Sequence, residues 1–315
     1  AIRRQRQMCI RDRYTDEEIK DMSDEEYRNN LYSLWTNYCV SESYEPGSTF
    51  KPVTVASALE EGVVKDGDTY VCKGFETVAD YKLKCHVFST IGSHGSLTVE
   101  QALMNSCNPY MIHLALEMGN SRFAYYQSLF GFGKITGIDL PGETTGIVYG
   151  DRMTTIDAAC NSFGQTINVN MMQMMAAYCS IINGGMFYQP HIVKRIESAN
   201  GEVVKEYKAN LVRQTITAST SKLLRRYLKN TVEEGTAKKA GVTGYSVAGK
   251  TGTAQKGDRK DNKWIISFIG HAPAENPKFA IYVVIDEPYG TTGTSGSSAA
   301  VSYTHLRAHE TSQDL

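Results

Sequence analysis

The sequence predicts an α/β chain of the α+β kind, with a central, mostly antiparallel sheet flanked by helices. Two near-continuous apolar runs, 264–270 and 279–286, are typical of buried strands, and a short Pro-containing loop joins them. Because this loop is too short to hold a crossover helix, the two strands should pair antiparallel with both faces covered. Helical segments before and between the strands place helices and sheet in one mixed fold.

The two ends of the chain do not resemble a folded protein. Residues 1–13 are basic and have no helical or strand periodicity, and like residues 301–315 they resemble translated sequencing-adapter DNA. We therefore treat 1–13 as a non-native leader and 301–315 as a non-native tail, and we expect one domain over 14–300.

The first element of that domain is an acidic helix over 14–35, in which Ser23 and Glu26 have the spacing of a capping box. Apolar periodicity and turn signals predict the remaining elements. They are helices at 97–116, 121–130, 171–178 and 217–234, an ordered glycine-rich loop at 131–143, a hairpin around Asn200-Gly201 and a further strand at 245–255.

Composition narrows the class of protein. The chain has 315 residues, 41% of them apolar, which is enough for one large core or for two lobes that share an interface. Lys and Arg (33) nearly balance Asp and Glu (34), which argues against a nucleic-acid partner. No run of about 18 apolar residues occurs, so we expect neither a membrane span nor a signal peptide within this chain.

The chain has seven cysteines, too few for a dense disulfide framework at this length. Cys72 and Cys85 bracket a polar stretch that predicts a hairpin, whose two ends could meet. A disulfide between them is possible in an oxidising compartment, and the alternative is two reduced cysteines. Zinc is a weaker alternative, because His86 and His94 lie nearby but the spacing matches no common zinc finger. We expect no metal and no cofactor.

A Pro-Gly turn delivers Ser48 to the start of an apolar run that predicts a buried helix ending before Gly62. Lys51 lies on the same helical face, so its amine can come within reach of the Ser48 hydroxyl. A serine nucleophile with a lysine base would be built in this way. Taken alone the spacing is a weak signal, because a helix-capping serine also explains it and Ser219 with Lys222 repeats it.

Two further motifs follow in chain order. Ser106 and Asn108 form a Ser-x-Asn motif in a predicted helix, and Lys250 opens a Lys-Thr-Gly-Thr motif on a predicted strand. Ser-x-x-Lys, a Ser-x-Asn motif and Lys-Thr-Gly together resemble the motif set of penicillin-binding proteins and class A β-lactamases. All three in this order are far less probable by chance than any one of them.

Each motif residue has a chemical use. Ser48 would attack a carbonyl, and Lys51 could take its proton only if burial and a second cation, Lys250, lowered its pKa from about 10.4 towards neutrality. Ser106 would relay a proton to the leaving amine. Asn108 would hold the substrate amide or the Lys51 side chain.

The strand motif would bind the substrate. Gly252 permits close approach of another backbone, and the amides of Thr253 and Ser48 could form an oxyanion hole. The hydroxyls of Thr251 and Thr253 suit a substrate carboxylate.

The resemblance extends beyond the motifs. Stretches similar to class B penicillin-binding proteins, and more narrowly to the cell-division and sporulation transpeptidases of Gram-positive bacteria, lie at 44–51, 130–143, 162–165, 182–185, 247–255 and 281–288. This resemblance covers about 14–300 and implies a two-lobed fold that adds an all-helical lobe to the sheet. It also implies that Ser48 is the acylated nucleophile of a peptidoglycan D,D-transpeptidase.

The same resemblance implies partners and a location. Stem peptides would be the substrates, β-lactam antibiotics the covalent inhibitors, and a septal or sporulation glycosyltransferase a partner of the full-length protein. The protein would act at the extracytoplasmic face of the cell membrane. Because the family's membrane anchor, pedestal domain and final helix have no counterpart here, we expect a C-terminally truncated transpeptidase fragment.

Other functions remain open. A β-lactamase needs a base that activates the deacylating water, and this sequence has no Glu-containing loop with a convincing context for it. A β-lactam-sensing domain or a non-catalytic septal scaffold would not need such a loop. Residues 244–251 also match the phosphate-loop pattern of an NTPase, with 281–286 as its metal-binding strand. A phosphate loop needs a helix that starts at its Lys-Thr, and the residues after Thr251 have no helical period, which argues against nucleotide binding.

Overall fold

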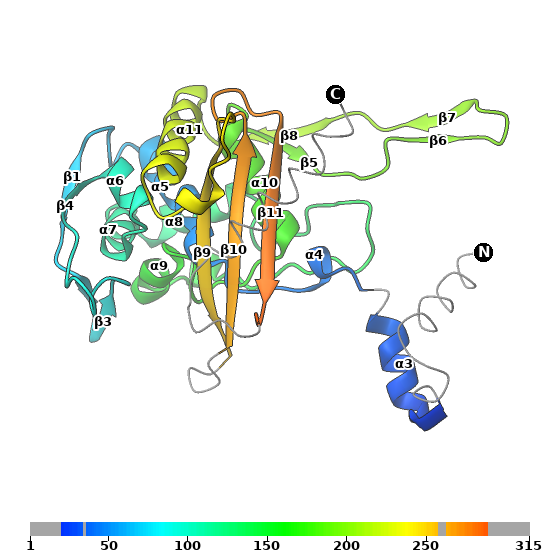
Figure 1. Cartoon of the computed structure of the whole chain (residues 1–315), viewed down its shortest axis with the longest axis horizontal. Helices are drawn as coiled ribbons and strands as arrows, with labels where there is room; N and C mark the ends of the chain where they lie inside the picture. The colour runs from blue at the N-terminus through cyan, green and yellow to red at the C-terminus, as the bar shows by residue number, and fades with distance from the viewer. Residues whose placement is uncertain (1–19, 34–35, 258–262, 289–315) are drawn as a thin grey trace.

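The structure is a computed structural model that describes residues 20–33, 36–257 and 263–288 (Figure 1). The expected leader and tail lie outside these residues. The α-helices are α3 (Asp24–Ser33), α4 (Tyr38–Ser41), α5 (Lys51–Glu61), α6 (Val99–Met104), α7 (Asn108–Met118), α8 (Asn120–Leu129), α9 (Thr155–Asn161), α10 (Met171–Ile182) and α11 (Ala218–Glu233), with 3₁₀ turns η1 (Gly47–Phe50), η2 (Gly150–Arg152) and η3 (Lys238–Ala240). The strands are β1 (Thr69–Cys72), β2 (Phe75–Val78), β3 (Tyr81–Lys84), β4 (Gly95–Thr98), β5 (Met186–Gln189), β6 (Arg195–Glu197), β7 (Val203–Glu206), β8 (Asn210–Gln214), β9 (Ala248–Lys256), β10 (Lys263–Ala272) and β11 (Phe279–Asp286).

The main sheet has three antiparallel strands in the order β11-β10-β9. Phe268 in β10 lies opposite Val283 in β11 and Thr251 in β9, so the predicted antiparallel pairing is confirmed. The expectation that both strands have covered faces is right for β10, which is buried along most of its length, and wrong for β11, whose residues are mostly half-buried. Among the described residues β9 has a strand partner on one side only and forms an edge of the sheet.

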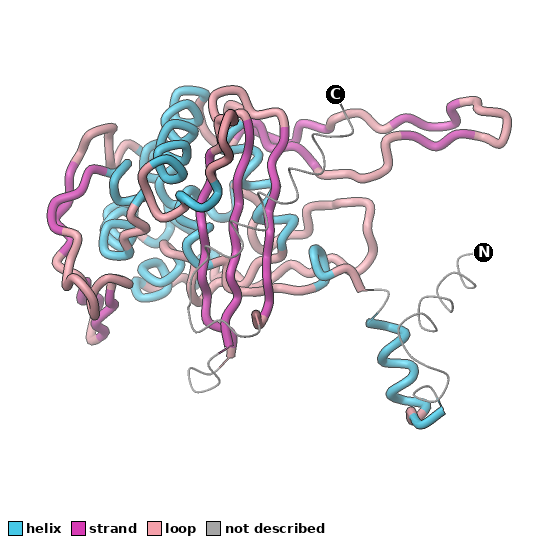
Figure 2. Tube along the Cα trace, viewed as in Figure 1, coloured by secondary structure: helices cyan, strands magenta, loops and turns pink. Residues whose placement is uncertain are grey.

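Helices cover the sheet and extend beyond β9 into a second lobe (Figures 1 and 2). Helix α11 packs on β9 and α10 packs on β11, while α5 contacts α7, which in turn contacts α9. One apolar core runs through these helices and includes the fully buried Phe50, Phe123 and Tyr178. The expectation of an all-helical lobe is wrong, because the small sheets β1–β4 and β2–β3 are attached to this lobe.

The predicted helix at 97–116 is wrong as a single element, because α6 ends at Met104 and α7 begins at Asn108. Apolar periodicity continues across the interruption and conceals it in the sequence. Ser106 has a φ of +56° there, which no continuous right-handed helix can accommodate. Pro109 then lies in the first turn of α7, where its missing N–H leaves no helical hydrogen bond unmade.

Most other predicted elements are confirmed. Helix α11 is capped by the Thr217 side chain, α10 is largely buried, and β6–β7 form a hairpin with Gly201 at a φ of +86°. Figure 1 shows this hairpin extending from β5–β8, a strand pair that the sequence does not predict. The acidic helix is shorter than predicted: α3 begins after Ser23, whose Oγ accepts the Glu26 N–H at 3.2 Å. Residues 14–19 and 34–35 of that prediction lie outside the described part.

The polar stretch between Cys72 and Cys85 forms the predicted hairpin, β2–β3. Both cysteines are free in the structure, so the disulfide considered from the sequence is not formed. Within the described part of the chain, no helix is both long and apolar enough to cross a membrane.

Candidate active site

Ser48 lies in η1, a 3₁₀ turn that runs directly into α5, with Lys51 as the first residue of that helix. Gly47 adopts a φ of +56°, and a Cβ there would lie 2.5 Å from the backbone oxygen of Thr253. The turn is therefore packed against β9, and only glycine fits. Helix α5 ends where predicted, because Gly62 caps it in the left-handed conformation.

Lys51 is fully buried and makes three polar contacts. Its Nζ donates to the Ser106 carbonyl oxygen at 2.6 Å, to Ser106 Oγ at 3.0 Å and to Asn108 Oδ1 at 2.7 Å. Ser106 Oγ in turn donates to Ser48 Oγ at 3.0 Å. Lys51 is thus connected to Ser48 through Ser106, where the sequence suggested a direct contact, and Asn108 holds the lysine side chain.

Ser106 occupies the interruption between α6 and α7, and its positive φ is uncommon for a residue other than glycine. With this backbone conformation, both its carbonyl oxygen and its hydroxyl contact Lys51. Strain of this kind costs about 1–3 kcal/mol and is concentrated at functional sites. The helix interruption is therefore what brings the second motif to the first.

Lys250 brings the third motif into the site from β9. Its side chain is fully buried, and its Nζ donates to the Thr251 carbonyl oxygen at 3.1 Å and to Thr236 Oγ1 at 3.4 Å. Burial, and then the charge of Lys51, hold the pKa of Lys250 well below its usual range. Thr236 follows α11 and belongs to no motif, so no sequence signal identifies it.

Burial also lowers the pKa of Lys51 to about 8, against the opposing influence of the Cys85 and Cys107 thiols. The sequence predicts Lys250 as the cation that depresses the pKa of Lys51. In the structure, burial is the main cause that lowers the pKa of both lysines, and the repulsion between the two amines disfavours a charge on both of them. Two buried ammonium groups close to each other are disfavoured, because each lowers the stability of the other's charged form.

The remaining strand residues lie where β9 passes the Ser48 turn. A Cβ on Gly252 would lie 2.4 Å from Ser267 Oγ and 2.8 Å from Thr49 Cγ2, so glycine is needed for this close approach. Thr251 is 9% exposed, and Thr253 is half-buried. All eight predicted site residues therefore come from η1, α5, the α6–α7 interruption and β9, which meet at the junction of lobe and sheet: Ser48, Lys51, Ser106, Asn108, Lys250, Thr251, Gly252 and Thr253.

Two competing sequence patterns are not assembled into sites. Ser219 and Lys222, the second Ser-x-x-Lys pair, are both exposed on α11. Residues 244–251 do not form a phosphate loop, because Lys250 and Thr251 continue along β9 where a nucleotide site needs the start of a helix.

A helical lobe packed on an antiparallel sheet, with these three motifs meeting at the junction, is typical of penicillin-binding proteins and class A β-lactamases, and the family comparison selects the penicillin-binding transpeptidase domains. The chain belongs to this family: the penicillin binding protein transpeptidase domain matches residues 11–306. The resemblance inferred from the sequence is confirmed.

Named relatives narrow the comparison. The chain is 42% identical over 270 residues to stage V sporulation protein D of Bacillus subtilis, covering 84% of this chain and 41% of the relative. It is 32% identical over 268 residues to the peptidoglycan D,D-transpeptidase FtsI of Escherichia coli, covering 84% of this chain and 43% of the relative. The chain therefore spans less than half the length of these relatives.

Solved structures agree with this assignment. Penicillin binding protein 3 of Mycobacterium tuberculosis superposes with a TM-score of 0.78 at 27% identity, covering 89% of this chain and 66% of that one. The same protein has been solved in complex with aztreonam and with ampicillin. Penicillin binding protein 2X of Streptococcus thermophilus also gives a TM-score of 0.78 at 27% identity, covering 89% of this chain and 43% of that one.

Proposed function

We propose that this chain is the catalytic part of a peptidoglycan D,D-transpeptidase that cross-links stem peptides through an acyl-enzyme on Ser48. The observation that carries the proposal is the hydrogen-bond chain from Lys51 Nζ through Ser106 Oγ to Ser48 Oγ, with 3.0 Å at each step. Family membership and the relative named as a D,D-transpeptidase support the reaction type.

In the first half-reaction, Ser48 Oγ attacks the carbonyl carbon of the penultimate D-alanine of a donor stem peptide. An ester bond forms, the peptide bond to the terminal D-alanine breaks, and the Ser48 proton passes through Ser106 Oγ to neutral Lys51. That proton then moves to the departing amine. With a pKa of about 8, Lys51 is neutral in a minor but sufficient fraction of molecules near pH 7.

Negative charge develops on the carbonyl oxygen during the attack, and hydrogen-bond donors must be positioned beside this oxygen to stabilise it. The backbones of Ser48 and Thr253 lie on the two segments that Gly47 allows to touch, and their amides are the proposed oxyanion hole. The edge of β9 would hold the donor peptide as an added strand, with the Thr251 and Thr253 hydroxyls at its carboxylate.

In the second half-reaction, the amine of an acceptor stem peptide attacks the ester carbon. The new peptide bond forms, the Ser48–carbonyl bond breaks, and the amine proton returns through Lys51 and Ser106 to Ser48 Oγ. β-Lactams would acylate the same oxygen, as expected for relatives of a protein solved with ampicillin. Such an enzyme would work at the extracytoplasmic face of the membrane, beside a septal or sporulation glycosyltransferase.

Labelling tests the assignment of the nucleophile. Incubation with a fluorescent penicillin, followed by proteolysis and mass spectrometry, should place the label on Ser48. The Ser48→Ala variant should remain unlabelled, and Ser219→Ala, which changes the exposed serine of the other Ser-x-x-Lys pair, should be labelled as fast as the unaltered chain. Label that persists in Ser48→Ala would overturn the proposal.

A further inference from the structure

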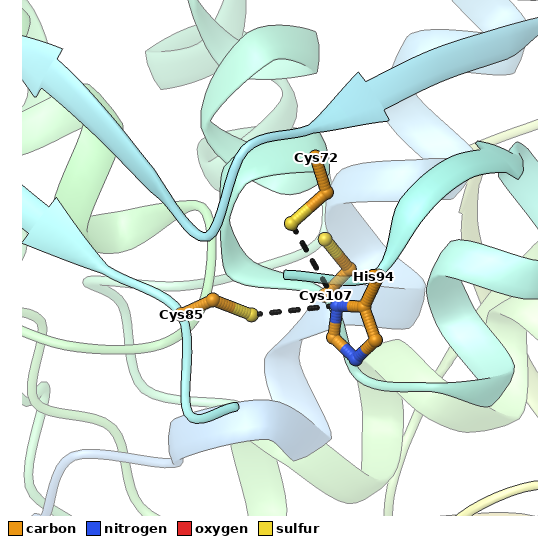
Figure 3. Close-up of side chains that lie close together, drawn as sticks. All are labelled: Cys72, Cys85, His94 and Cys107. Atoms are coloured by element: carbon orange, nitrogen blue, oxygen red, sulfur yellow. Dashed lines mark hydrogen bonds between the residues drawn. The ribbon is translucent and has the colours of Figure 1, made fainter. Parts of the chain in front are cut away.

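Three cysteines and one histidine converge beside the catalytic lysine without a part in the proposed reaction. Cys72 ends β1, Cys85 follows β3, His94 precedes β4, and Cys107 lies between the two residues of the Ser-x-Asn motif. The cysteines are 1%, 3% and 0% exposed, and His94 is half-buried. Figure 3 shows the four side chains pointing toward one another from separate segments of the chain.

The spacing of these atoms is compatible with a tetrahedral metal site. His94 Nδ1 lies 3.7 Å from Cys72 Sγ and 3.6 Å from Cys85 Sγ, and the ligand atoms of all four residues lie within 4.8 Å of one another. In a tetrahedral site with Zn–S of about 2.3 Å and Zn–N of about 2.0 Å, neighbouring ligand atoms are about 3.5–3.8 Å apart. The two S–N distances are therefore already close to the edge of such a tetrahedron.

We propose that Cys72, Cys85, His94 and Cys107 bind one Zn²⁺ ion in a closed Cys₃His site. Three thiolates and an imidazole are soft ligands that select zinc in a tetrahedral arrangement. The three thiols release their protons to solvent on binding, so the occupied site carries one net negative charge. With four protein ligands, no position remains for a substrate, and the ion is structural.

Surrounding contacts fit a metal site. The Gly74 N–H donates to Cys72 Sγ at 3.4 Å, the kind of backbone contact that orients a thiolate ligand. A Cβ on Gly74 would lie 2.0 Å from the Gly92 carbonyl oxygen, so the loops carrying Cys72 and His94 are held together closely. His86 also approaches Cys85 Sγ, at 3.8 Å, but its side chain is exposed and it lies outside the group of four.

The sequence pointed to Cys72, Cys85, His86 and His94 but not to Cys107, and predicted no metal because that spacing matches no common zinc finger. The missing ligand was concealed inside the catalytic motif. Because Cys107 lies between Ser106 and Asn108, a metal bound there fixes the start of α7, and with it the two partners of Lys51. The ion would thus act on the active site by holding the Ser-x-Asn segment.

Metal analysis of the full chain tests the proposal. Protein purified with a non-thiol reductant and dialysed against metal-free buffer should contain about one zinc per chain. Cys72→Ser and His94→Ala should each retain less than about a tenth of it. The matched control is Cys179→Ser, which removes a cysteine on α10 outside the cluster and should retain the full amount.

Cobalt provides a second readout that needs no variant to fold. Co²⁺ exchanged into the unaltered chain should give thiolate-to-cobalt charge-transfer bands and the visible bands of a tetrahedral ion. A reduced, folded chain that binds neither ion, or that carries iron, overturns the proposal. So does a disulfide among these cysteines that persists in zinc-loading conditions, seen as a chain resistant to alkylation. Penicillin labelling does not enter this test, so its outcome is independent of the proposed function.

Discussion

Ser106 Oγ lies 3.0 Å from Ser48 Oγ and is the atom through which the buried lysine reaches the nucleophile. The hydrogen bonds run from Lys51 to Ser106 and from Ser106 to Ser48, which is the direction expected for a protonated lysine. Loss of one proton from Lys51 would reverse the direction of both hydrogen bonds, so that Ser48 would donate to Ser106 and Ser106 to Lys51. In the proposed mechanism, the protonation state of this one amine would switch the site between resting and reactive forms.

Removing the Ser106 hydroxyl should slow acylation of Ser48 by fluorescent penicillin by about 10²–10⁴-fold, because the proton relay is lost. Ser106→Ala keeps the strained backbone, whereas Ser106→Gly relieves it, since glycine adopts the φ of +56° freely. Acylation should be slowed to the same extent in both variants, and the melting temperature of Ser106→Gly should be no lower than that of Ser106→Ala. A normal acylation rate in either variant would show that Lys51 acts on Ser48 directly.

The acylation rate should depend on pH through Lys51. Its pKa is lowered to about 8, so the reactive neutral amine gains population as pH rises towards 8. Stopped-flow measurement should give a rate that rises about tenfold per unit between pH 6 and 7 and levels off above pH 8. A flat profile from pH 6 to 8 would remove Lys51 from the role of base.

Lys51→Arg should acylate slower by about 10³-fold or more, and its remaining rate should no longer follow that pH profile, because a guanidinium does not give up its proton in this range. The larger head group must fit a fully buried position, so a thermal melt accompanies the measurement. Lys51→Met, which is neutral and similar in length, serves where the arginine variant does not fold. Lys222→Arg, on the exposed face of α11, is the matched control and should react normally.

Gly252→Ala should lower the free energy of unfolding by about 1–3 kcal/mol and slow acylation, because the new methyl group overlaps Ser267 Oγ at 2.4 Å and pushes β9 away from the Ser48 turn. Adding Ser267→Ala should recover part of both losses, since it removes the closest overlapping atom. Gly241→Ala, whose nearest atom would be 3.2 Å away, should have a smaller effect on chemical denaturation. Equal losses in Gly252→Ala and Gly241→Ala would contradict the close approach.

The sheet could be predicted because apolar runs and a short connection leave few ways to pair two strands. The antiparallel pairing of β10 with β11 follows from them, whereas the register is known only from the structure. The interruption at Ser106 could not be predicted, because the apolar pattern is the same on both sides and the strain is visible only in the backbone dihedrals. Strands β5 and β8 were missed because only short alternating segments separate them from the strong Asn200-Gly201 turn.

The residues of the candidate site could be proposed from the sequence because three motifs each kept a recognisable spacing, and the structure places them close together. The pKa values of Lys51 and Lys250 could not be predicted from the sequence, because they depend mainly on how deeply the fold buries the two amines. The grouping of Cys107 with Cys72 and Cys85 is equally hidden, since the three cysteines belong to separate segments that only the fold brings together.

The position of β9 at the edge of the sheet has a consequence for self-association. A sheet edge offers unpaired backbone groups to any extended chain and is a common starting point for aggregation. Here most of β9 is buried, because η1 and α11 pack along it. These neighbours hinder the approach of another folded sheet, so the strand proposed to bind the donor peptide is protected against polymerisation through its edge.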